Sequence, residues 1–441
     1  MTGLRWLVSC LLAAPLAAQQ PGSGAGCQFH IDSVGGLGIQ RVVGSDTNYY
    51  AGGFVQLSCI GTRVVMQSDS LIFFGRGRNS QALFIGHVRY RDSSITMDAD
   101  RGTYFRSGER WEARGKVVTT NLANGSTMRG PSLDYYRAMP GVRDTSEAYA
   151  IGRPTIHSFP RDSGGAPAEP YVVVGDRVRL KGDDRMWAGG RVTIDRSDFS
   201  AKGDSLFLDS GSGQKGLLLG DPRMRGLGRD SFELTGTRIA LALDGSAITY
   251  VSALGNGHAV SADLDLVADT IGLDLEKERL VQTVAWGREI RPRGVTSTHE
   301  LRGDSVAFDT PGQELREIRS FAAAWVGGKP DRASGERDWI AGDTITVSLV
   351  PWDSAGTERT AVQLIDARGA ARSFYRITNG GGPLASINYS RGDRILVRMK
   401  PPGEQGVDRV DIQGEVDGVH LEPVAVKADS AAGETTPGER P

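Results

Sequence analysis

The chain has 441 residues, of which 39% are hydrophobic and 24% are charged, and this balance excludes both a polytopic membrane protein and a wholly disordered chain. Lys and Arg total 51 against 53 Asp and Glu, so the chain has no overall positive charge that would attract nucleic acid. The 59 glycines recur between apolar segments along the whole chain, as turn residues do.

Residues 1–18 are typical of a secretory signal peptide. They combine an early positive charge, Arg5, with an apolar segment too short to span a bilayer and with small residues at Ala17 and Ala18. The sequence therefore predicts export. Two alternatives stay open, namely retention of the segment as an uncleaved anchor and a lipid anchor on Cys10.

Export places the cysteines that follow this segment in an oxidising compartment. Cys27 lies in an N-terminal lead-in that we place at residues 19–54, and Cys59 follows it shortly. A disulfide between them would stabilise the fold by about 3–4 kcal/mol on the chain-entropy model. The alternative is a pair of buried free thiols, and the sequence leaves both open.

From about residue 55 onward, a seven-residue phrase recurs ten times. An anchor residue, usually Asp, stands at position 0 and is followed by a polar residue at +1 and by apolar residues at +2 and +4. Position +4 is apolar in every copy, and position +2 is apolar in all copies except the one with Gly102. This alternation predicts a strand with one buried face. The anchors are Asp69, Asp100, Pro131, Asp176, Asp204, Thr237, Asp269, Asp304, Asp343 and Asp393.

Each copy is followed by a turn rich in Gly, Asp or Ser and then by a second apolar segment that contains a glycine, as in residues 111–118. The repeating unit is therefore a strand, a turn and a second strand. Longer intervals between anchors contain insertions. We predict a first part at 55–157, a Pro/Gly-rich insertion at 158–170, a second part at 171–423 and a disordered tail at 424–441.

Two segments, 275–284 and 313–325, would be predicted as helices if each were taken alone, because their apolar residues are spaced as on a helix. Their place in the repeat instead predicts a strand, a turn and a second strand in each. The sequence thus predicts an all-β fold throughout, with the strand pairs stacked on one another because a single pair cannot bury its apolar face.

Units such as residues 94–118, SITMDADRGTYFRSGERWEARGKVV, resemble the OstA/LptA-type domain of lipopolysaccharide-transport periplasmic proteins, the organic solvent tolerance-like N-terminal domain. The resemblance extends over about residues 55–420 and rests on the ten copies together. It implies an elongated β-jellyroll solenoid of stacked strand-turn-strand repeats, open along one side. It also implies a periplasmic location, with association to the inner or outer membrane left open.

The function that the resemblance implies is non-enzymatic transport of lipopolysaccharide, or a related lipid, as a bridge between the inner and outer membrane that assists outer-membrane assembly. The implied partners are lipopolysaccharide or another acylated lipid and other lipopolysaccharide-transport components, which join by edge-strand addition. Head-to-tail self-association is implied by the same edges.

Positions +2 and +4 of the central copies are the candidate lining of a lipid groove. Their side chains share one face, and each buried methylene of an acyl chain would contribute about 0.8 kcal/mol. The alternative is that these residues fill a dry core. The candidate lining residues are Leu206, Leu208, Ile239, Leu241, Ile271, Leu273, Val306, Phe308, Ile345 and Val347.

The sequence contains no motif for a nucleophile elbow, a phosphate-binding loop or a metal site, so we expect no catalysis, no cofactor and no metal. The balanced charge predicts no nucleic-acid partner. The recurrent Asp is expected to cap turns. Trp111, Trp187, Trp286 and Trp325 are expected in the core, with sugar-stacking surfaces as the alternative. The rival function is that of a secreted β-solenoid adhesin or polysaccharide-processing protein.

Overall fold

The computed structural model describes residues 27–422, apart from 45, 76–78, 162–163, 168, 228–230, 246, 263, 278, 331–334, 355–356, 378–385 and 405. This part of the chain consists mainly of β-strands, with the short 3₁₀ helices η2 (Arg106–Gly108) and η3 (Pro311–Gln313) between them, and the predicted all-β fold is confirmed. The predicted signal peptide and C-terminal tail lie outside the described residues.

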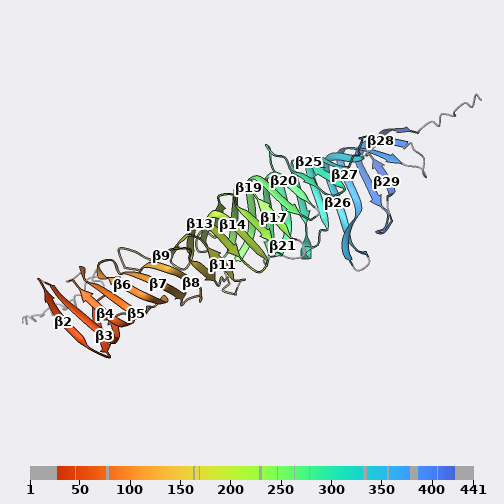
Figure 1. Cartoon of the computed structure of the whole chain (residues 1–441). Coiled ribbons are helices and arrows are strands. Elements are labelled where there is room, and N and C mark those ends of the chain that lie inside the picture. The colour runs from red at the N-terminus through yellow and green to blue at the C-terminus, as the bar shows by residue number, and fades with distance from the viewer. Residues whose placement is uncertain are drawn as a thin grey trace, which may run out of the picture. The chain divides into compact units, whose positions relative to one another are not determined.

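The chain divides into two compact units. The N-terminal unit, red to yellow in Figure 1, contains residues 27–156 and Arg177–Asp183. Its strands are β1 (Phe29–Val34), β2 (Gly38–Val43), β3 (Asp46–Cys59), β4 (Val65–Phe74), β5 (Gln81–Arg91), β6 (Ile95–Phe105), β7 (Arg110–Asn121), β8 (Thr127–Tyr136), β9 (Glu147–Ile151) and β12 (Arg177–Lys181), with β10 (Thr155–Ser158) at its boundary.

The C-terminal unit, olive to blue in Figure 1, contains His157–Asp176 and residues 184–422. Its strands are β11 (Tyr171–Val174), β13 (Arg185–Asp195), β14 (Phe199–Asp209), β15 (Lys215–Leu219), β16 (Arg223–Gly226), β17 (Phe232–Thr235), β18 (Arg238–Asp244), β19 (Ala247–Ser261), β20 (Asp265–Glu276), β21 (Arg279–Trp286), β22 (Arg293–Val295), β23 (His299–Arg302), β24 (Ser305–Asp309), β25 (Glu317–Gly328), β26 (Trp339–Ser354), β27 (Thr357–Ile377), β28 (Ser386–Met399), β29 (Val407–Gln413) and β30 (Asp417–Leu421).

Strands pair antiparallel in both units, and most long strands bend near their middle. In β14, residues 205–209 pair with 185–189 of β13, whereas residues 200–203 pair with 192–195, and the register shifts between them. Each bend divides a strand between two half-sheets. We call the half that carries positions +1 to +5 the anchor half-sheet and the other the opposite half-sheet.

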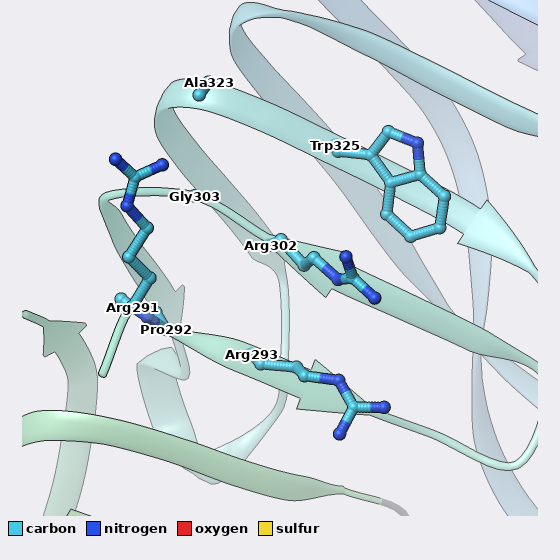
Figure 2. A pocket seen from close by; sticks show the side chains of 7 residues that line it. All are labelled: Arg291, Pro292, Arg293, Arg302, Gly303, Ala323 and Trp325. Atoms are coloured by element: carbon cyan, nitrogen blue, oxygen red, sulfur yellow. The ribbon is translucent and has the colours of Figure 1, made fainter. Parts of the chain in front are cut away.

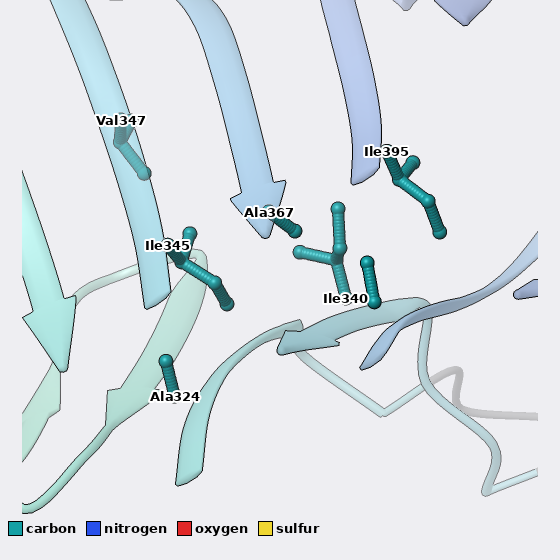
Figure 3. Close-up of a cluster of buried hydrophobic side chains, with 7 residues drawn as sticks. Ala324, Ile340, Ile345, Val347, Ala367 and Ile395 are labelled. Carbon is teal, nitrogen blue, oxygen red and sulfur yellow. The ribbon is translucent and has the colours of Figure 1, made fainter. Parts of the chain in front are cut away.

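The two half-sheets of a unit face each other across an apolar interior. In the C-terminal unit, one buried cluster contains Ile345 of the anchor half-sheet and Ile340 of the opposite half-sheet, with Ala367 and Ile395 beside them (Figure 3). In the N-terminal unit, the ring of Trp111 lies 5.1 Å from that of Tyr90, measured between centroids, and so joins the two half-sheets. The alternation predicted from the sequence therefore directs apolar side chains of both half-sheets into the interior.

The recurrent anchor lies at the bend, and most anchors fall inside a strand instead of just ahead of it. Asp100, within β6, faces Gly115 of β7, where the chain takes positive φ at Gly115 (78°) and Lys116 (45°). On the N-terminal side of the anchor, the same strand belongs to the opposite half-sheet, where the +1 to +4 pattern of the repeat does not occur. The same carboxylate-to-glycine contact recurs at Asp69–Gly86, Asp176–Gly190, Asp204–Gly220, Asp269–Gly287, Asp343–Gly369 and Asp393–Gly414.

Replacing Gly115 with Val should lower the free energy of unfolding of the N-terminal unit by about 2–3 kcal/mol, because β-branched residues avoid positive φ. A Cβ there would also lie 2.5 Å from Oδ2 of Asp100. A urea titration measures the loss. The control is Gly125→Val. Gly125 has a nearly equal φ of 79° but no atom within 4 Å of an added Cβ, and the replacement should cost about 1–2 kcal/mol. Equal losses would show that the contact with Asp100 contributes nothing.

The two segments with helix-like spacing both form strands. Residues 275–284 run from the end of β20 through a turn into β21, as predicted. In the segment 313–325, Gln313 ends η3 and residues 317–325 belong to one strand, β25, without the predicted turn. Positive φ at Ala322 (55°) and Ala323 (51°) bends this strand where other copies carry glycine, so the bend replaces the turn.

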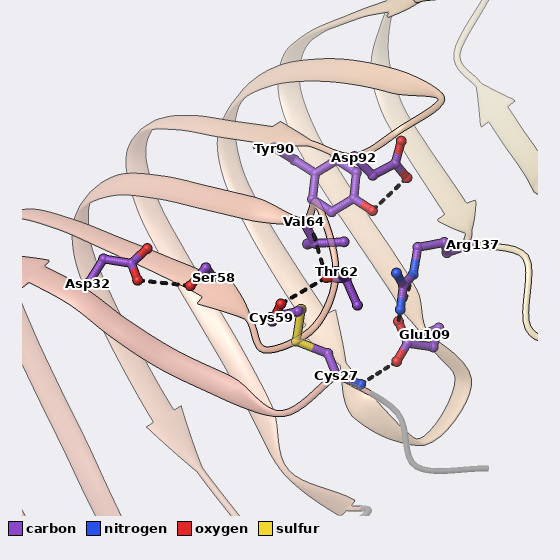
Figure 4. Close-up of a disulfide and its surroundings, with 10 residues drawn as sticks. All are labelled: Cys27, Asp32, Ser58, Cys59, Thr62, Val64, Tyr90, Asp92, Glu109 and Arg137. Carbon is purple, nitrogen blue, oxygen red and sulfur yellow. Dashed lines mark hydrogen bonds and ion pairs between the residues drawn. A yellow bond between two sulfur atoms is a disulfide. The ribbon is translucent and has the colours of Figure 1, made fainter. Parts of the chain in front are cut away.

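The predicted N-terminal lead-in forms β1, β2 and much of β3. A disulfide joins Cys27 and Cys59, with 5.2 Å between their Cα atoms (Figure 4). The backbone N–H of Cys27 also donates a hydrogen bond to the carboxylate of Glu109. Since Glu109 follows β6, the disulfide and this bond fasten the start of the described chain to the interior of the N-terminal unit.

Candidate functional site

All ten predicted lining residues point into the interior of the C-terminal unit. The five at position +2 have 0–2% of their surface exposed, and the five at position +4 have 5–9% exposed. The +4 residues stand nearer the strand ends, where turns connect the strands. The interior is therefore most accessible along this turn edge. The residues are Leu206, Ile239, Ile271, Val306 and Ile345 at +2, and Leu208, Leu241, Leu273, Phe308 and Val347 at +4.

The +2 residues form one continuous column across paired strands of the anchor half-sheet. Each is directly opposite a residue of the next strand, and from β18 onward large side chains alternate with Ala or Ser. The column runs Leu206, Leu218, Ile239, Ala253, Ile271, Ala285, Val306, Ser320, Ile345, Ala367 and Ile395.

The +4 residues form a second column beside the first, toward the turn edge. Several of its members, such as Ile318 and Val397, are only partly buried although they face the interior. Apolar surface therefore continues out to the turn edge. The column runs Leu208, Gly216, Leu241, Val251, Leu273, Thr283, Phe308, Ile318, Val347, Ile365 and Val397.

The opposite half-sheet supplies a third column that faces the first two. Its members are apolar from Met224 and Leu234 through Leu266 and Leu301 to Ile340. After Ile340 the column continues with two serines, Ser373 and Ser390, both buried. The apolar interior therefore becomes polar on one side near the C-terminal end of the unit.

The sequence analysis missed the residues that complete the columns, because it followed only the first strand of each two-strand repeat. Ala253, Ala285 and Ala367 each stand two residues before the glycine of the bend and are fully buried. The alanine two residues before Gly255, Gly287 and Gly369 was the signal that could have found them. The period of two along a strand places that residue on the interior face.

The same period corrects the prediction for three tryptophans. Trp111 lies four residues before its glycine and is buried, with 1% exposed, as expected. Trp187 and Trp286 lie an odd number of residues before Gly190 and Gly287, so they point outward, and Trp286 is 39% exposed. Trp325 also points outward. The core position predicted for these three is wrong, because closeness to the glycine was counted without the alternation of faces.

The interior of the N-terminal unit is more polar at its turns. Asp92, between β5 and β6, is buried and accepts hydrogen bonds of 2.9 Å from the hydroxyls of Tyr90 and Tyr135. Burial and the Asp92 charge raise the pKa of both hydroxyls, which keeps them protonated as donors. At the other end of β6, Arg137 donates two hydrogen bonds, of 2.5 and 2.9 Å, to buried Glu109 (Figure 4). Buried ionisable side chains therefore lie at both ends of β6, although this unit also has a paired apolar column of Leu71, Phe84, Gly102, Ala113, Leu133 and Ala150.

No group of three or more His, Cys, Asp or Glu side chains within the described ranges is arranged to hold a metal ion. Those ranges also contain no helix with the length and apolar character needed to cross a membrane. What the arrangement offers chemically is apolar contact along the interior and charged side chains on the outer faces.

The chain was compared with protein families, curated proteins and solved structures. No protein-family model matches this chain, and no curated protein matches it. Among solved structures, it is similar to LptH from Pseudomonas aeruginosa, described as the LptA-homologous periplasmic component of the conserved lipopolysaccharide transport device. The two chains are 14% identical, with a TM-score of 0.25, and the match covers 29% of this chain and 96% of LptH.

Proposed function

We propose that this chain binds the acyl chains of lipopolysaccharide, or of a related lipid, in the interior of the C-terminal unit and carries the lipid across the periplasm without chemical reaction. The observation that carries the proposal is the pair of columns, apolar except at Ser320 and Thr283, that run side by side from β14 to β28. The resemblance of the repeat to lipopolysaccharide-transport proteins points to the same ligand class.

The columns suit a ligand that moves. We call each repeat of two strands a rung. The first strand of each rung presents a large residue at +2 and another at +4, as Ile271 and Leu273 do on β20. Each methylene that leaves water contributes about 0.8 kcal/mol, so several rungs together bind an acyl chain while no single rung dominates. Because neighbouring rungs are nearly equivalent, a lipid can move from one to the next over small barriers.

Free strand edges support a bridge made of several proteins. Among the described strands, β2 pairs with β3 alone and β30 pairs with β28 alone. Both end strands expose apolar side chains, including Val42 on β2 and Val419 on β30, which are 73% and 54% exposed. Such edges accept a further strand, so we propose that transport partners or a second copy of this chain join there by strand addition.

Photo-crosslinking tests the proposal. A diazirine side chain of leucine size at Leu273 or Phe308 should form adducts with lipopolysaccharide, because both residues face the interior near the turn edge. Probes at Thr270 and Ser305 are the matched controls. These two residues lie in one cross-strand row with Trp286 on the outer face of the same strands, and they should give no adduct above background.

Equal labelling at interior and outer positions would overturn the proposal, and so would the absence of adducts at Leu273 and Phe308 in a protein with unchanged circular dichroism. In either case the interior is a dry core, and the adhesive or structural function would replace transport.

A further inference from the structure

The outer face of the C-terminal unit carries a cationic hollow of about 610 Å³ on its opposite half-sheet, within the range of about 300–1,000 Å³ usual for small-molecule sites. Arg291, Arg293 and Arg302 line it together with Trp325 (Figure 2). Arg302 is paired directly with Arg293 on one side and with Trp325 on the other, so the three side chains form one row across β22, β23 and β25.

A single carboxylate organises these arginines. Glu300, whose side chain is only 10% exposed, accepts hydrogen bonds from Arg293 (2.6 Å), Arg302 (2.5 and 2.8 Å) and Arg337 (3.0 Å). Partial burial alone would raise the pKa of Glu300, but the three arginines lower it to about 2. The carboxylate therefore stays ionised at any physiological pH and holds the three guanidinium groups in place.

The site keeps an excess of positive charge. Arg291 pairs with Asp304 at 3.4 Å, so four guanidinium groups face two carboxylates. Each guanidinium carries five N–H donors, and one shared carboxylate uses only a few of them. Trp325 fixes the array further, because the guanidinium of Arg302 lies 5.2 Å from its ring centroid. Donors held in place by a buried anion are what an incoming oxyanion requires.

The hollow also has walls without charge. Gly303 and Ala323 line it at the bend beside Arg291 and Arg302, and Pro292 and Trp325 provide apolar surface. A ligand that fills it needs an anionic group for the arginines and a compact body with C–H surface for the walls. We propose that this hollow binds a phosphorylated saccharide. This site lies on the outer face and goes beyond the lipid binding proposed for the interior.

The same half-sheet contains a matched control. On β16 and β17, Glu233 pairs with Arg223 (3.2 Å) and Arg225 (2.7 Å), which repeats the motif of one carboxylate shared by cross-strand arginines. Its arginines do not line the hollow. Arg225→Ala therefore removes a comparable exposed charge without touching the proposed site.

Isothermal titration calorimetry of the full chain at low salt tests the site, with glucose 6-phosphate, glucose, inorganic phosphate and adenosine monophosphate as separate probes. Glucose 6-phosphate should bind about tenfold more tightly than phosphate, and glucose should not bind. Arg302→Ala should weaken the binding about tenfold or more, since charged hydrogen bonds are lost, while Arg225→Ala should change it less than twofold. Arg302→Lys, which keeps the charge without the planar fork, should restore only part of the affinity.

The proposal would be overturned if the wild type and Arg302→Ala had equal affinity for both glucose 6-phosphate and lipopolysaccharide micelles, or if the wild type bound neither of these probes. Binding of adenosine monophosphate or phosphate as tightly as glucose 6-phosphate would also overturn it, because the saccharide would then not be recognised. A parallel titration with lipopolysaccharide micelles separates a lipid-borne sugar phosphate from a free one: a loss of binding in Arg302→Ala that is confined to the micelles assigns the lipid-borne source. Crosslinking at Leu273 is an independent readout, so failure of the interior lipid site and failure of this site are distinguishable.

Discussion

Replacing Trp111 with Ala should lower the free energy of unfolding of the N-terminal unit by about 3–5 kcal/mol, the usual cost of deleting a buried aromatic ring. The ring lies between the half-sheets, with its centroid 5.1 Å from those of Phe84 and Tyr90 and 6.0 Å from that of Tyr104. Loss of the ring leaves a cavity between the two half-sheets, and the strands on either side cannot move together to fill it. Hydrogen exchange of the amides in β5–β8 measures the change within this unit.

Two control variants define the effect. Trp111→Phe should cost clearly less, because a ring remains and because the buried indole N–H, which has no acceptor among the described residues, is removed. Trp187→Ala deletes an outer-face ring whose centroid lies 5.3 Å from that of Phe207, and should cost about 1 kcal/mol. A loss below about 1 kcal/mol for Trp111→Ala would contradict a packed interior in the N-terminal unit.

Reducing the Cys27–Cys59 disulfide should destabilise the N-terminal unit by about 3–4 kcal/mol, since a loop of this length regains its entropy in the unfolded chain. The two cysteines are 32 residues apart. Reduction also releases the N–H of Cys27 from its bond to Glu109, which is buried and holds Arg137. The measurement is a urea titration of the unit with and without reductant.

The double variant Cys27→Ser, Cys59→Ser is the control for this prediction. It should unfold at the lower urea concentration with or without reductant, while the C-terminal unit, which contains neither cysteine, should keep its own transition. An unchanged transition of the wild type on reduction would show that the cysteines are free thiols in the folded protein.

The inward positions could be predicted from the sequence because they depend only on the alternation within one strand. Leu206 and Leu208 belong to a phrase with apolar residues at +2 and +4, and two residues along a strand always return to the same face. Both residues are buried in the structure, at 2% and 9% exposed. Burial alone does not separate a lipid groove from a dry core, so the role of these residues is decided by crosslinking.

The bends could not be predicted, since they depend on contacts between residues of different strands. Asp100 and Gly115 meet at a bend, but neither marks one when taken alone. The one copy of the repeat without an apolar side chain at +2 has a similar cause. Gly102 occupies a +2 position because a Cβ there would lie 2.6 Å from Cζ2 of Trp111, whose ring fills the space. A pattern within one strand contains no information on that neighbour.

The bend at which an anchor residue meets its glycine also explains how such a chain can change length during evolution. The anchor carboxylate belongs to one strand and its glycine to the next, as Asp100 of β6 and Gly115 of β7 do. A tandem duplication of a whole strand pair therefore brings both partners of a new bend with it, and the added pair extends each interior column by one matching step. Duplication or deletion of a single strand would separate an anchor from its glycine, so selection should favour lengths that differ by complete units.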